Sequence, residues 1–131
     1  MIICSLLLII ISQIILNLLN ELLKIIKSGD VEGYKKMVDE NLTCIEPETG
    51  GNLVRGLPFH IFLLEKTIQN DFHFEIVNPV IKIVGDMCYI SYTLSNIIMD
   101  DTKPKFSQFQ ETRIFEKMEN EWKMIHFHRS G

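Results

Sequence analysis

Residues 87–129 read MCYISYTLSNIIMDDTKPKFSQFQETRIFEKMENEWKMIHFHR, a stretch in which apolar and polar side chains alternate with the period of two that is typical of β-strands. Two clusters of turn-forming residues divide it, Asp100 to Pro104 and Glu119-Asn120. The pattern therefore predicts long strands joined by antiparallel connections. The strands are expected at residues 87–98, 105–117 and 121–129.

One more strand is expected before this stretch. Alternating apolar residues begin after Asp71, and Asn78-Pro79 interrupts them. Residues 80–84 then resume the strand as a bulged continuation, because proline in a strand interior is typical of a bulge or an edge. Gly85-Asp86 supplies the turn into residue 87. The meander thus has three consecutive antiparallel connections.

The first part of the chain has helical periodicity instead. Apolar residues between Ile14 and Ile26 recur at helical spacing, and Ser28-Gly29 is a typical left-handed helix stop. Asp30 is expected to cap a second, shorter helix that runs to about Asp39. The inward residues of that helix are expected to be Val31, Tyr34, Met37 and Val38.

The connection between these helices and the meander is expected to be irregular. Residues 42–56 contain one proline and three glycines, so they are predicted to be mostly loop, with one short strand at residues 43–46. Pro58 is expected to begin a third helix that ends near Asn70 and forms a wall or a lid. Its inner face is expected to carry Phe59, Phe62 and Leu63.

The N-terminal residues are unusually apolar, since residues 2–19 read IICSLLLIIISQIILNLL. Four interpretations stay open: a signal peptide, a membrane span, a buried helix extension, or a start that is foreign to the domain. No basic residue precedes Lys24, which disfavours a signal peptide, and the polar Ser12, Gln13 and Asn17 disfavour a span. We therefore separate residues 1–12, to which the sequence assigns no single role, from a domain at residues 13–131.

Composition limits the function classes. The 131 residues suit one domain, and 47% hydrophobic with 23% charged residues exclude a disordered chain. The net charge of -4, without any Lys/Arg run longer than two, makes nucleic acid an unexpected partner. Three widely spaced cysteines form no CxxC pair, so no zinc site, disulfide framework or cofactor is predicted, and a cytoplasmic location is expected.

Helices followed by a long meander are typical of an α+β domain. We expect the N-terminal helices to pack on one face of a strongly curved antiparallel sheet, which leaves a conical cavity between them. The chain has no Gly-rich phosphate loop, no His-Arg-Asp and no Asp-Phe-Gly, which excludes a kinase catalytic core. Such a wide meander exposes apolar surface unless the helices or another chain cover it, and the sequence pattern alone leaves both open.

Five segments carry a resemblance to a known family. They are Ser28-Gly29-Asp30, Ile45-Glu46-Pro47-Glu48 with Gly51-Asn52-Leu53-Val54, Gly56-Leu57-Pro58-Phe59-His60, Glu111-Thr112-Arg113 and residues 125–131, IHFHRSG. From about Gln13 to Gly131 the chain resembles the association, or hub, domain of calcium/calmodulin-dependent protein kinase II. The resemblance implies a cone-shaped domain of the nuclear-transport-factor-2-like superfamily. It also implies a non-catalytic oligomerisation module that forms stacked dimers in rings, alone or with full-length kinase subunits.

A candidate pocket follows from the expected register of the last hairpin. If residue 119 lies opposite 121, Phe127 faces Arg113 and Glu111 faces Arg129, so both arginines share one sheet face. Two buried guanidinium groups need acidic partners or an anionic ligand, because an unpaired buried charge is costly. Two interpretations therefore remain: an internal salt-bridge network with Glu111, and a carboxylate-binding pocket.

The resemblance adds His60 to the residues that line this cavity, together with Arg113 and Arg129, and we include Tyr34 as a candidate. Two departures from the family pattern, Leu94 in place of a third cavity arginine and Ile68 in place of a loop tryptophan, predict weaker anion binding.

Two other kinds of chemistry are disfavoured. His126 and His128 share the other sheet face, but the spacing places no third metal ligand beside them. Tyr34 and His60 suggest acid/base chemistry, yet the available bases, Glu46, Glu48 and Glu111, are as easily arginine partners. The alternative to a hub module is thus a small-carboxylate-binding or orphan enzymatic cone domain.

Overall fold

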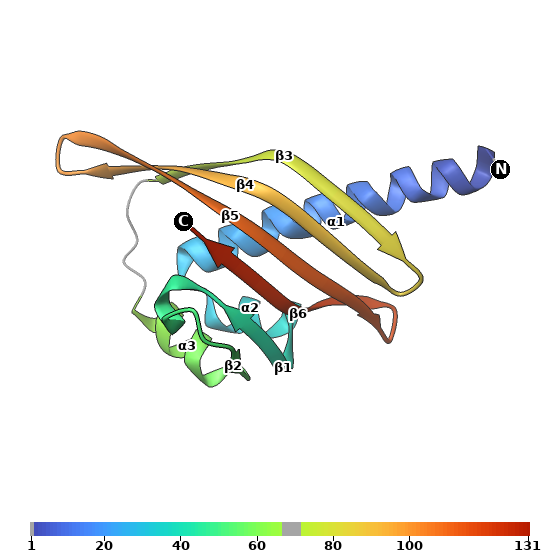
Figure 1. The fold of residues 1–131 in the computed structure, drawn as a ribbon, viewed down its shortest axis with the longest axis horizontal. Helices are drawn as coiled ribbons and strands as arrows, with labels where there is room; N and C mark the ends of the chain where they lie inside the picture. Colours follow the sequence, from blue (N-terminus) through green and yellow to red (C-terminus); the bar gives the residue numbers. More distant parts are fainter. Residues whose placement is uncertain (1, 67–71) are drawn as a thin grey trace.

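The computed structural model describes residues 2–66 and 72–131, and it has the expected α+β architecture (Figure 1). Three helices accompany one six-stranded sheet of order β2-β1-β6-β5-β4-β3. The elements are α1 (Ile2–Ser28), α2 (Val31–Met37), β1 (Val38–Ile45), the 3-10 turn η1 (Pro47–Thr49), β2 (Val54–Arg55), α3 (Pro58–Glu65), β3 (Phe72–Val84), β4 (Met87–Asp100), β5 (Lys103–Met118) and β6 (Glu121–Ser130).

The meander forms as the alternation predicts. Strands β3 to β6 pair in sequence order and antiparallel, and the register of β3 against β4 shifts between Val77 and Val80, around the predicted Asn78-Pro79 bulge. Asp101 has a positive φ of 55° in the β4–β5 turn, which is shorter than predicted because Asp100, Lys103 and Pro104 lie in strands. The sheet is mixed, since β1 runs parallel to β6.

Helix α1 lies along one face of the sheet, and its N-terminal turns extend beyond the sheet edge (Figure 1). The part from Ile15 to Leu23 contributes the helix's share of the core, since Ile15, Leu19, Leu22 and Leu23 are buried in the core cluster. Gly29, at φ 70°, ends the helix as predicted.

The apolar N-terminal residues are exposed in the monomer. Ile3, together with Leu6 through Ile10, is exposed, so a buried helix extension is wrong for this chain by itself. The reason is geometric, because these turns lie past the sheet edge (Figure 1). Residues Ile3–Ser28 are long and apolar enough for a membrane span by length and composition, with 11% of the apolar window buried.

Three expected boundaries need correction. Helix α2 ends at Met37 rather than near Asp39, and β1 begins at once at Val38 rather than at residue 43. The polar residues after Val38 conceal this strand, which exists because it pairs with β6. Helix α3 ends at Glu65, and the predicted end near Asn70 lies outside the described residues.

The inner face of α3 also differs from the prediction. His60 and Leu64 are buried, whereas Phe62 is exposed and Phe59 and Leu63 are half-buried. The helix is too short and too uniformly apolar for the sequence to define one inward stripe. The contacts of His60 with Tyr34, Cys44 and Phe127 decide which side of the helix faces inward.

We expect burial on α1 to decide stability. Leu19→Ala removes a side chain with 0% exposure and should lower the free energy of unfolding by about 2–5 kcal/mol. Leu7→Ala, at a position with 55% exposure on the same helix, should change it by no more than about 0.5 kcal/mol. Urea unfolding at one fixed protein concentration measures both, and equal losses would contradict the packing of α1 described above.

Candidate functional site

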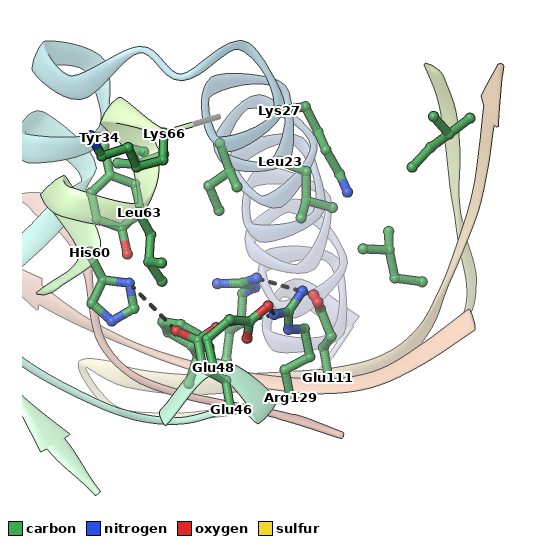
Figure 2. Close-up of a pocket in the computed structure, with 16 residues that line it drawn as sticks. Leu23, Lys27, Tyr34, Glu46, Glu48, His60, Leu63, Lys66, Glu111 and Arg129 are labelled. Carbon is green, nitrogen blue, oxygen red and sulfur yellow. Dashed lines mark hydrogen bonds and ion pairs between the residues drawn. The ribbon is translucent and has the colours of Figure 1, made fainter. Parts of the chain in front are cut away.

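A cavity of about 440 Å³ opens between α1, α3 and the concave face of the sheet (Figure 2). All five residues singled out from the sequence line it: Tyr34, His60, Glu111, Arg113 and Arg129. Six residues that the sequence analysis did not assign to the cavity also contribute to its wall: Leu23, Ile26, Lys27, Leu64, Lys66 and Ile98. Tertiary packing thus brings α1, α2, α3, β5 and β6 together at one site.

The register of the last hairpin places both arginines in the cavity. Arg113 lies opposite Phe127 and Glu111 opposite Arg129, as predicted. The turn itself differs, because Met118 pairs with Glu121 and the two-residue turn Glu119-Asn120 has positive φ at both positions. A register shift between Ile114 and Phe115 compensates for this difference. The predicted alignment is therefore correct at the cavity but wrong near the turn.

Arg113 is fully buried and held by its own neighbours. Its Nη2 donates to Glu111 Oε1 at 3.1 Å, and its Nε donates to the Tyr92 hydroxyl at 2.9 Å. The same hydroxyl donates to Glu111. Burial by itself lowers the pKa of Arg113, but Tyr92 and Glu111 outweigh that effect and raise it above the usual value. The guanidinium group is therefore charged and structurally engaged.

Arg129 uses different carboxylates. Its Nη2 contacts Glu46 Oε2 at 3.5 Å and also Glu48 Oε1, which the close-up shows converging on it (Figure 2). The hydrogen bond from Arg129 lowers the pKa of Glu48 despite the opposing effect of burial. The expectation that Glu111 serves both arginines is right for Arg113, while Glu46 and Glu48 serve Arg129. An internal salt-bridge network is thus present.

His60 and Tyr34 form the part of the cavity wall beside this network, where His60 Nδ1 lies 4.0 Å from Glu46 Oε1. The His60 ring stacks on Tyr34 with centroids 6.0 Å apart and meets Phe127 edge-on at 5.0 Å. Burial, with Arg113 and Arg129 nearby, lowers the pKa of His60 to about 4. Burial also raises the pKa of Glu46 to about 6, against the influence of Arg129. At neutral pH the imidazole is therefore uncharged.

One of the two departures from the family pattern lies within the described residues. Leu94 is buried and lines the cavity, so an apolar side chain lies on its wall. Ile68 lies outside the described residues. His126 contacts Thr43 Oγ1 through Nδ1 at 2.7 Å, away from the cavity. The three side chains whose metal-ligating atoms the fold does bring together in the described part of the chain are Cys44, Glu46 and His60.

The fold and the sequence of nearly the whole chain agree with one family. The family model described as calcium/calmodulin dependent protein kinase II association domain matches residues 12–131. The chain belongs to this family. This association domain is 39% identical over 124 residues to the delta subunit of calcium/calmodulin-dependent protein kinase type II from Oryctolagus cuniculus. The match covers 91% of the chain.

That match spans 23% of the rabbit subunit, so the chain corresponds to about a quarter of its relative's length. A solved association domain of the Caenorhabditis elegans kinase superposes with a TM-score of 0.88 at 33% identity, covering 92% of this chain and 95% of that one. A nuclear-transport-factor-2-like protein from Cytophaga hutchinsonii superposes with a TM-score of 0.76 at 19% identity, covering 92% and 97%, and supports the fold alone.

The Arg113–Glu111 pair should be costly to break. Glu111→Gln leaves a buried guanidinium without its carboxylate and should lower the free energy of unfolding by about 3–5 kcal/mol. Replacing both partners, as Glu111→Gln with Arg113→Met, should recover part of the loss because no buried charge remains. Urea denaturation followed by circular dichroism measures each variant.

The matched control is Glu75→Gln, which breaks an exposed pair with His73 and should change stability by no more than about 0.5 kcal/mol. If Glu111→Gln cost no more than this control, the pair would not constrain the sheet.

Proposed function

We propose that this association domain assembles with copies of itself into a ring-shaped hub. The observation that carries the proposal is the family match over residues 12–131, together with the superposition on a solved kinase association domain. Stacked dimers, joint assembly with full-length kinase subunits and a role in organising calmodulin-dependent phosphorylation belong to the same proposal. We propose that the domain itself has no catalytic activity.

The outer face of the sheet supports self-assembly physically. Cross-strand partners share a face, so the register places Val84, Met87, Tyr89, Met99 and Phe106 on the side opposite the buried Ile90 and Tyr92. All five outer side chains are exposed in the monomer. Val84, Met87 and Tyr89 lie at one end of the meander and Met99 with Phe106 at the other, and grouped exposed apolar side chains are typical of protein-protein interfaces. A second copy of the chain is the partner that the family match favours.

A membrane is the less favoured partner. The exposed apolar turns, residues 3–10, measure about 12 Å at helical rise, short of the roughly 30 Å hydrocarbon core. A full span would have to remove Ile15, Leu19, Leu22 and Leu23 from the core. We propose a cytoplasmic location, supported by the cysteines Cys4, Cys44 and Cys88, which are free among the described residues. The net charge of -4 argues against nucleic acid.

Light scattering coupled to size-exclusion chromatography tests the assembly. At micromolar concentration the chain should elute as a ring-sized oligomer, and Tyr89→Asp should shift it toward smaller species because it places a charge on the outer apolar face. Leu53→Asp is the control, since Leu53 is also exposed but lies in the loop before β2. A monomeric parent chain would overturn the proposal.

A second candidate function is carboxylate binding in the cavity. The observation that favours it is Arg129 Nε, a buried donor without a hydrogen-bond partner among the residues described. An unsatisfied buried donor is costly, so a ligand oxygen that accepts from it gains free energy. Glu48 is exposed and can leave Arg129 without being buried elsewhere. Binding should nonetheless be weak, because every incoming carboxylate competes with Glu46 and Glu48.

Calorimetric titration with small carboxylates tests this candidate. The parent chain should release heat, and Arg129→Gln should remove it while leaving the fold intact, because Arg129 is less buried than Arg113. Glu48→Gln should tighten binding by removing the internal competitor. Arg55→Gln, at an exposed arginine on β2 that does not line the cavity, should leave binding unchanged. Equal heats from the parent and Arg129→Gln would overturn the candidate.

A further inference from the structure

Three buried side chains with metal-binding atoms converge beside the cavity. The thiol of Cys44, the carboxylate of Glu46 and the imidazole of His60 place their ligand atoms within 4.8 Å of one another. Cys44 Sγ lies 2.9 Å from His60 Nε2 and 4.0 Å from Glu46 Oε1. The sequence offered no motif for this group, because Cys44 and His60 are sixteen residues apart on a strand and a helix.

Regular structure holds all three side chains in place. Cys44 lies in β1, and Glu46, two residues later, continues the extended backbone as the N-cap of η1, which places both side chains on one side. Cys44 is fixed by pairing with Val54 on one side and Phe127 on the other. The stacking of His60 on Tyr34 orients its ring. The group is therefore ordered before any ion binds, which lowers the cost of binding.

The two oxygens of Glu46 have different neighbours. Its Oε2 contacts Arg129 at 3.5 Å, while its Oε1 lies 4.0 Å from His60 Nδ1 and 4.0 Å from Cys44 Sγ. A carboxylate that is oriented through one oxygen by a second group is the usual arrangement at metal sites. Arg129 thus positions Glu46 and leaves Oε1 on the side of the thiol and the imidazole.

We propose that Cys44, Glu46 and His60 bind a zinc ion, with a fourth position open toward the cavity. A mixed set of sulfur, nitrogen and oxygen ligands suits this borderline-soft ion, which binds tetrahedrally. Tetrahedral zinc, with bonds of about 2.3 Å to sulfur and about 2.0 Å to nitrogen, requires Cys44 Sγ and His60 Nε2 to be about 3.5 Å apart, against 2.9 Å in the structure. Binding therefore moves the imidazole away from Cys44 by less than 1 Å. The thiol proton is released to solvent as the thiolate takes the ion.

The open position follows from which residues reach the cavity. Glu46 and His60 line it, whereas Cys44 lies behind them. A bound ion would therefore face the cavity through its fourth site and accept water or a carboxylate there. This inference does not rest on ring assembly, since all three ligands belong to one chain.

Cobalt titration of the full chain tests the proposal, because thiolate ligation of Co²⁺ produces a near-ultraviolet charge-transfer band. The background is Cys4→Ser, which removes the exposed thiol. One equivalent of Co²⁺ should produce the band together with the visible absorption of tetrahedral cobalt, and one equivalent of Zn²⁺ should abolish both. His60→Gln should weaken cobalt affinity at least about tenfold.

Cysteine variants separate the site from the other thiols. Cys44→Ala should eliminate the charge-transfer band, whereas Cys88→Ala, which removes the other buried thiol, should leave it unchanged. Circular dichroism and thermal unfolding establish that each variant is folded. If Cys44→Ala does not fold, Cys44→Ser replaces it in the titration. No band in the Cys4→Ser background, or a band that survives the loss of Cys44, would overturn the proposal and leave an ordinary hydrogen bond between Cys44 and His60.

Discussion

The neutralisation of two guanidinium groups inside the cone is the constraint on which the arrangement of the site depends. A buried charge without a partner costs several kcal/mol, so each arginine on the concave face needs a carboxylate within reach. Arg113 receives Glu111 from its own strand, two residues away, and the Tyr92 hydroxyl from β4. Arg129 receives Glu46 and Glu48 from the segment that follows β1. The second arrangement ties β6 to the residues that follow β1, the strand that carries Cys44.

The two faces of the sheet have different chemistry. The concave face is closed by α1 and α3 over a polar network, and its cavity is lined by both charged and apolar residues. The outer face carries exposed apolar side chains with no helix over them (Figure 1). The proposed surface association and the proposed cavity binding thus involve opposite faces of the same strands. Assembly can therefore occupy the outer face without closing the cavity.

Much of the fold was predictable because the signals are local. Alternation marked β3 to β6, Ser28-Gly29 ended α1, and Asn78-Pro79 marked the bulge in β3. The Arg113–Phe127 alignment was predicted from a turn centred on Asn120, although the true turn has two residues. The predicted alignment is correct at Arg113 because the register shift between Ile114 and Phe115 offsets the one-residue difference between the predicted turn and the true turn. That agreement depended on an irregularity that the sequence does not reveal.

The sequence by itself determined the α+β class, the strand order of the meander and the likeness to an association domain. These features follow from periodicity, turn residues and matched segments, and each of these signals lies within a short stretch of sequence. Only the tertiary structure decided that β1 starts at Val38 and runs parallel to β6, and that Glu46 and Glu48 rather than Glu111 serve Arg129. It alone brought Cys44 against His60. Such contacts join residues far apart in the chain, and their free energy is gained only when separate elements pack, so no local pattern encodes them.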